Sequence, residues 1–107
     1  MKTIDVANAF SKRPYGRYRE DGPFSGQDFR DKHIVPALKN IGNDKLNVDL
    51  SGSRRYGSSF LDESFGGLVR VGFDVKFLKS HLEITHNELP SIVELCWLYI
   101  LQADSKE

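Results

Sequence analysis

"KLNVDLSGSRRYGSSFLDESFGGLVR", residues 45–70, is the stretch that decides the fold. Over residues 45–52, leucine and valine side chains alternate with polar ones, which is the pattern of a half-buried strand. A turn rich in glycine and serine follows, and a helix is expected from Ser58 or Ser59 to about residue 70. The apolar line of this helix is Leu61, Phe65 and Leu68.

The segments on either side continue an alternation of strands and helices. We expect strands at 3–6 and 82–86, a loop over 11–24 in which "GRYR" could form a short strand, and a helix from 25 to about 40. Residues 73–81 suit either a helix or a strand, with a short helix favoured, and a final helix is expected that Asn87 caps and that contains Pro90 in its first turn. Such alternation favours the α/β class, a small mixed sheet packed with crossover helices.

The helix after residue 24 carries clear start signals. Ser25 is the expected N-cap with Asp28 at N3, a weaker form of the capping box. Phe24 and Phe29 have the spacing of a hydrophobic staple. Pro36 lies inside the helical pattern, so a kink or an early end is expected there.

Length and composition predict a single domain over residues 1–107, with a first strand region at 1–10, a basic Gly/Pro loop at 11–24 and a frayed tail at 103–107. The 15 basic and 15 acidic residues balance, so no global field draws the chain to nucleic acid or to a membrane. The single cysteine, Cys96, is expected to be a buried hydrophobe of a reducing compartment. No secretory signal or membrane span is evident, and we expect a cytoplasmic protein.

The motifs "SKRPYGRYREDGPFSGQDFR", "VPAL" and "VDLSGSRRYGSSFLDESFGGLVR" resemble a bacterial family of uncharacterised STAS-like domains over roughly residues 6–71. STAS names the domain shared by sulfate transporters and anti-sigma factor antagonists. The resemblance implies a single STAS-like domain that uses no cofactor, is not an enzyme, and regulates another protein by binding it.

The same resemblance implies a site. Ser58 falls where the antagonists carry their phosphorylatable serine, and Ser59 matches the next serine. In those proteins the unphosphorylated form captures a kinase-like ATPase, and phosphorylation by that partner releases it. The Asp that precedes the serine there is Gly57 here, and the Gly that follows the pair is Phe60. Asp62 and Glu63 would meet a phosphate as like charges.

Other residues around the serines allow two interpretations each. Ser59 is also the expected cap of its helix. Arg54, Arg55 and Phe60 are expected to form an exposed interaction rim. Arg17, Arg30, Asp62 and Glu63 form either a polar cluster that braces the 11–24 loop or ordinary surface charge. The pair Gly66 and Gly67 indicates either close packing of the helix on the sheet or a groove for a partner's backbone.

Two further hypotheses belong to other classes. The basic stretch 11–19, with its interleaved tyrosines, is compatible with a nucleic-acid-associated, mobile-element or defence-related protein, although neutral overall charge favours a solvated loop. The other hypothesis is an enzyme that uses Glu63 and Arg17 in a cleft, but no feature of the sequence indicates a substrate for it. The histidines lack metal-ligand spacing, and no catalytic residue or metal site is expected. The apolar final helix makes a homodimer plausible.

Overall fold

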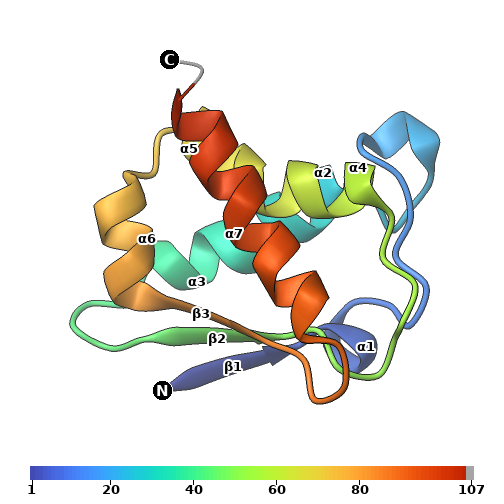
Figure 1. Cartoon of the computed structure of the whole chain (residues 1–107), viewed down its shortest axis with the longest axis horizontal. Helices are drawn as coiled ribbons and strands as arrows, with labels where there is room; N and C mark the ends of the chain where they lie inside the picture. The colour runs from blue at the N-terminus through green and yellow to red at the C-terminus, as the bar shows by residue number, and fades with distance from the viewer. Residues whose placement is uncertain (106–107) are drawn as a thin grey trace.

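A three-stranded sheet in the order β1-β2-β3 organises the chain (Figure 1). β1 spans Lys2–Asp5, β2 spans Leu46–Asp49 and β3 spans Leu82–Thr85. The computed structural model describes residues 1–105. The predicted α/β class is confirmed, and both strand pairs are parallel where a mixed sheet was expected. Parallel neighbours require crossover connections, and helices supply them.

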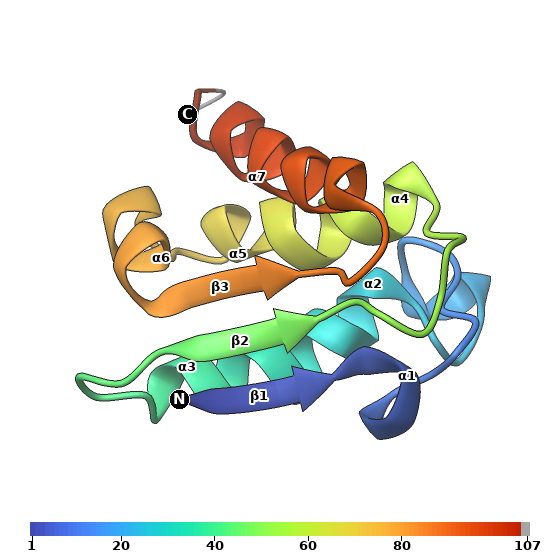
Figure 2. The ribbon, with the colours of Figure 1, turned by 60° about the horizontal axis from the view of Figure 1, so that its bottom comes forward.

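Helices lie together on one face of this sheet (Figures 1 and 2). Two of them are continuous but contain a π turn in the middle. The helices are α1 (Val6–Ala9), α2 (Gly26–Phe29) followed by the π turn Arg30–Ile34 and α3 (Val35–Lys39), α4 (Ser58–Leu61) followed by the π turn Asp62–Gly66 and α5 (Gly67–Arg70), α6 (Val75–His81) and α7 (Pro90–Ser105).

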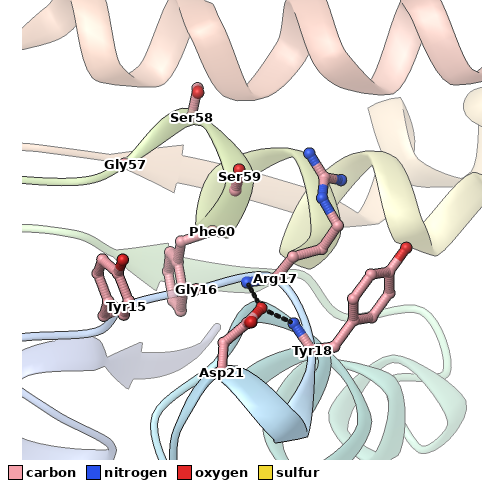
Figure 3. Close-up of a pocket in the computed structure, with 9 residues that line it drawn as sticks. All are labelled: Tyr15, Gly16, Arg17, Tyr18, Asp21, Gly57, Ser58, Ser59 and Phe60. Atoms are coloured by element: carbon pink, nitrogen blue, oxygen red, sulfur yellow. Dashed lines mark hydrogen bonds between the residues drawn. The ribbon is translucent and has the colours of Figure 1, made fainter.

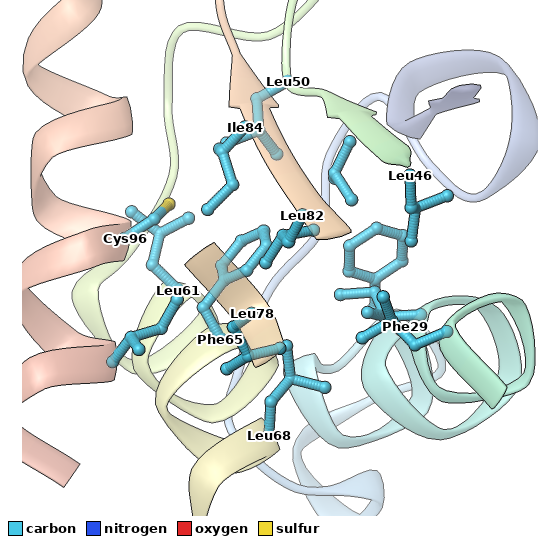
Figure 4. Close-up of a cluster of buried hydrophobic side chains, with 14 of the residues drawn as sticks. Phe29, Leu46, Leu50, Leu61, Phe65, Leu68, Leu78, Leu82, Ile84 and Cys96 are labelled. Atoms are coloured by element: carbon cyan, nitrogen blue, oxygen red, sulfur yellow. The ribbon is translucent and has the colours of Figure 1, made fainter. Parts of the chain in front are cut away.

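The core lies between the sheet and these helices (Figure 4). The strands alternate as the sequence predicts, with apolar side chains facing the helices and polar ones facing away. The apolar set is Leu46, Val48, Leu82 and Ile84, and the polar set is Asn47, Asp49, Glu83 and Thr85. Fully burying a side chain of this size contributes about 1.5–3 kcal/mol.

The last helix contributes to the core along one line. Cys96 lies at its centre, is fully buried as expected, and burial raises the pKa of its thiol. The buried residues of this line are Ile92, Cys96, Ile100 and Ala103. The predicted fraying of 103–107 is wrong for 103–105, because α7 continues to Ser105 with Ala103 packed inward. Residues 106–107 lie outside the described part.

The segment "GRYR", residues 16–19, does not form the expected strand. Gly16 has a φ of +89°, and the carboxylate of Asp21 accepts hydrogen bonds from the backbone N–H groups of Arg17 and Tyr18 at 3.0 Å each. These bonds fold the chain into a 3₁₀ turn at Arg19–Asp21. A local carboxylate therefore occupies the donors that strand pairing would need.

The start of the second helix follows the sequence prediction, and its middle does not. The backbone N–H of Asp28 donates to the Ser25 hydroxyl at 3.2 Å, so the predicted N-cap is confirmed. Pro36 does not end the helix. In the π turn before it, the Val35 N–H donates to the Arg30 carbonyl, and this wider turn accommodates a residue without an N–H.

The predicted cap of the last helix is wrong. Asn87 lies three residues before Pro90, where α7 begins, and its backbone N–H donates to the Ser51 hydroxyl at 2.9 Å. The ring of His86 organises this connection instead, since its Nδ1 accepts the N–H groups of Glu88 and Leu89 at 3.0 Å each. Pro90 is in the first turn, as predicted.

The glycine pair makes room for neighbouring helices rather than for the sheet. A Cβ on Gly67 would lie 2.5 Å from Nη1 of Arg30. A Cβ on Gly66 would lie 2.6 Å from the Asp62 carboxylate and 3.1 Å from the Tyr99 carbonyl of α7. Close packing therefore accounts for both glycines, but against neighbouring helices and not against the sheet as the sequence interpretation had it.

Candidate functional site

Three connected hollows lie where the strands end. Each parallel strand points to the same rim of the sheet, and the segments 6–24, 50–57 and 86–89 that follow the strands gather there (Figure 2). The hollows share lining residues: Tyr15 belongs to the first and second, and Lys12 and Gly52 to the second and third. The carboxyl rim is the usual ligand side of parallel α/β sheets.

The first of these, the serine hollow, has a volume of about 560 Å³ and is lined by Ser58 and Ser59 (Figure 3). Both serines are exposed, in the first turn of the 58–70 helix. The expected cap at Ser59 is wrong, because the N-cap is Gly57, with φ −68° and ψ 147° and no side chain to bond. Both hydroxyls are therefore left without a capping role.

Phe60 is not part of an exposed rim, and that prediction is wrong. Its side chain is fully buried at the base of the hollow. Its ring stacks on Phe29 at a centroid distance of 5.9 Å and on Phe10 at 6.4 Å, and lies 6.0 Å from Tyr56. Residues from three separate segments thus close over Phe60, which explains why a large apolar side chain at this position is buried.

The four residues of the expected polar cluster come together in the structure. Nη1 of Arg17 lies 2.7 Å from Asp62 and 3.4 Å from Glu63, and Nη1 of Arg30 lies 2.5 Å from the other Glu63 oxygen. Arg70 approaches Asp62 at 3.4 Å. The hydrogen bond to Asp62 outweighs partial burial and raises the pKa of Arg17. Two carboxylates are thus shared by three guanidinium groups.

This cluster ties the 11–24 loop to the helix, which leads to a prediction. Arg17→Gln removes the cation that reaches from the loop to Asp62, at a half-buried network site. We expect a loss of about 1 kcal/mol of unfolding free energy, measured by urea denaturation, and faster proteolysis within residues 11–24. Lys39→Gln, at an exposed position that forms no ion pair with residues 1–105, is the control. An unchanged cleavage rate would contradict the bracing role.

The second hollow, which we call the basic hollow, has a volume of about 700 Å³. Four cationic side chains line it: Lys12, Arg13, Arg54 and Arg55. Arg54 pairs with Glu88, which also lines the hollow. Within residues 1–105, no ion pair is formed by the other three cations.

The basic stretch of the sequence is therefore divided by the fold. Lys12 and Arg13 line the basic hollow, whereas Arg17 and Arg19 are engaged elsewhere. Arg19 lies 2.5 Å from Asp28 and 3.2 Å from Asp31. The cations that join Lys12 and Arg13 come instead from the loop after β2.

Sequence reasoning missed the residues that hold these loops in place. Nε2 of His86 lies 2.8 Å from the Ser53 carbonyl, and since Nδ1 accepts two N–H groups, Nε2 carries the proton and donates. The Tyr56 hydroxyl donates to the Leu50 carbonyl at 2.8 Å. Both bonds join segments without regular secondary structure, so no periodic pattern in the sequence predicts them.

Several negative findings apply to the described residues. Within residues 1–105, no group of three or more His, Cys, Asp or Glu side chains is placed to hold a metal ion. None of the helices in this range combines the length and apolar character needed to cross a bilayer.

On α7, three leucines are exposed at one-turn spacing, Leu95, Leu98 and Leu101. The exposure of these leucines does not by itself test the expected homodimer, which stays a prediction.

The family comparison confirms the resemblance seen in the sequence. The family described as "STAS-like domain of unknown function (DUF4325)" matches residues 25–91, more than half of the chain. The matched segment contains all of the 50–57 loop, the serine pair and β3, and it excludes the 11–24 loop. No curated protein and no solved structure matches the chain.

Proposed function

The chain belongs to the family of STAS-like domains of unknown function, and from this premise we propose that it is a non-enzymatic regulatory module that binds another protein. Ser58 is the residue whose phosphorylation controls that binding, and a kinase-like ATPase is the partner. The observation that carries the proposal is the exposed position of Ser58 in the first turn of a helix, beside a hollow.

The electrostatics of the helix start also support a modifiable serine. Asp62 and Glu63 would repel a phosphate on Ser58 if their charges were free. In the structure both carboxylates are paired with arginines, at distances of 2.7 Å for Asp62 and 2.5 Å for Glu63. The repulsion expected from the sequence is therefore largely offset, and the positive end of the helix favours an added anion.

Phosphorylation at Ser58 gives a direct prediction. We expect Ser58→Asp to weaken binding of the partner by roughly tenfold or more, because a charge placed inside an interface removes its complementarity. Ser58→Ala is expected to bind normally. The partner is first identified by pull-down with the products of neighbouring genes, and affinities are then measured by titration calorimetry.

Ser91→Asp is the matched control, since Ser91 is an exposed serine in the first turn of α7. Mass spectrometry of the protein purified with its partner and ATP is expected to locate phosphate on Ser58. An unmodified Ser58, together with unchanged binding of Ser58→Asp, rules out the switch and leaves only the interaction.

The alternative of a nucleic-acid interface on residues 11–19 is less well supported. Such an interface needs several free cations along one surface. Arg17 and Arg19 are both held by carboxylates, so the stretch retains only Lys12 and Arg13. We therefore keep protein binding as the proposed function.

A further inference from the structure

The basic hollow is a concentration of positive charge in a chain whose formal charges cancel. Its lining holds four cations and one carboxylate, Glu88. Lys12, Arg13, Arg54 and Arg55 are all exposed, so the hollow presents a local positive field to the solvent. A field of this kind attracts anionic groups.

The shape of the hollow favours an extended occupant. It is open, and it continues through Tyr15 into the serine hollow and through Lys12 and Gly52 into the third hollow, which Asp5 and Asp49 line. Tyr15, 73% exposed, stands between the first two. A compact ion would fill a small part of this path, whereas a stretch of extended polypeptide follows it.

The walls of the hollow are held in place by bonds between its two loops. The N–H of Asn87 donates to the Ser51 hydroxyl at 2.9 Å, and Nε2 of His86 donates to the Ser53 carbonyl at 2.8 Å. Arg54 and Glu88 therefore project from connected loops. A site with a fixed frame loses less conformational entropy when it binds.

One carboxylate already occupies the hollow. Glu88, 48% exposed, pairs with the guanidinium of Arg54. This pair shows that the geometry accepts a carboxylate on Arg54, and it means that an incoming acidic residue that pairs with Arg54 has to replace Glu88. Arginine and carboxylate fit together because the planar fork can donate two parallel hydrogen bonds.

We propose that the basic hollow is the docking site for an acidic, carboxylate-rich segment of the partner protein, and that Glu88 is its built-in competitor. This inference rests on the proposed function, since it needs a protein partner at this rim. The docked segment extends into the adjoining serine hollow, which brings the partner to Ser58. The docked segment does not extend into the third hollow, because the carboxylates of Asp5 and Asp49 there repel any anionic ligand.

A fluorescein-labelled peptide that alternates glutamate and serine tests the site by fluorescence anisotropy at low salt. We expect binding that weakens as salt is added. Arg54→Gln and Arg55→Gln are each expected to lower the affinity roughly twofold to fivefold, the range of a single exposed charge pair. Lys39→Gln, an exposed cation on the helix that ends at the opposite rim, is the control and is expected to bind as the wild type does.

Glu88→Gln gives the most selective result. Removing the competitor is expected to raise the peptide affinity roughly twofold to threefold, although it changes only a surface residue. An unchanged or lower affinity contradicts the competitor role. No peptide binding, or binding that neither Arg54→Gln nor Arg55→Gln weakens, overturns the docking site.

An oligothymidylate with the same number of charges distinguishes the other class of ligand. If it binds the same cations more tightly than the peptide does, the hollow is a nucleic-acid site and the inference is wrong. These readouts do not involve phosphorylation. If the peptide does not bind but the partner still phosphorylates Ser58, only the docking site is rejected. If the peptide binds but Ser58 is not phosphorylated and Ser58→Asp has no effect, only the switch is rejected.

Discussion

Phe60→Ala is expected to destabilise the fold by about 4 kcal/mol, as is usual when a buried phenylalanine is truncated to alanine. The ring is fully buried, and it contacts aromatic side chains from the segment after α1, from α2 and from the loop after β2. Alanine would leave a cavity that these rigid rings cannot fill. The free energy of unfolding in urea measures the effect.

Phe24→Ala is the control for Phe60→Ala. Phe24 is 43% exposed and packs edge-on against Phe10 at 5.5 Å, so its removal is expected to cost about 1 kcal/mol. If Phe60→Ala cost no more than Phe24→Ala, Phe60 would be a surface residue after all, and the exposed rim predicted from the sequence would be restored.

Gly26→Ala is expected to destabilise the fold by about 3 kcal/mol, although alanine is the better helix former by about 1 kcal/mol. A Cβ at this position would lie 2.6 Å from the Phe60 carbonyl, 2.9 Å from Cβ of Glu63 and 3.2 Å from the Ser64 N–H nitrogen. Two of these atoms are backbone, so a side-chain rotation cannot relieve the contact. The sign of the effect therefore separates tertiary packing from local propensity.

Gly57→Ala provides the comparison for Gly26→Ala. Gly57 has a φ of −68°, and in the described part of the chain nothing lies within 4 Å of the position that an alanine methyl group would take, so a loss below about 1 kcal/mol is expected. Thermal and urea unfolding should both rank Gly26→Ala as less stable than Gly57→Ala. A Gly26→Ala protein as stable as the wild type would show that the two helices separate more easily than their contact suggests.

The parts of the fold that sequence predicts are those fixed by local patterns. Leu61, Phe65 and Leu68 were expected on the buried face of their helix, and all three are fully buried. The strands at 46–49 and 82–85 follow from alternation in the same way. Periodicity shows which face of a helix or strand packs against the core, and that information was sufficient to predict this helix and these strands.

The features that sequence did not predict depend on contacts between distant segments. Phe60 is buried because Phe10 and Phe29 reach it, and neither is close to it in the chain. The Ser59 cap failed by a shift of two residues, since the helix starts after Gly57. Glu88 pairs with Arg54, which is 34 residues away in sequence, so no local pattern indicates this pair. The four-residue polar cluster was one of two interpretations that the sequence left open, and the ion pairs in the structure decide in its favour.

The parallel sheet also gives the molecule two unlike ends. At the end opposite the hollows, the chain returns to β2 through the tight turn at 40–45, where Gly42 takes a left-handed φ of +61°. The amino terminus begins on this side, and the last turn of α7 ends towards it (Figure 2). An affinity tag or surface tether attached to the amino terminus therefore lies away from the three hollows, and protein immobilised in this way keeps the hollows accessible to solvent.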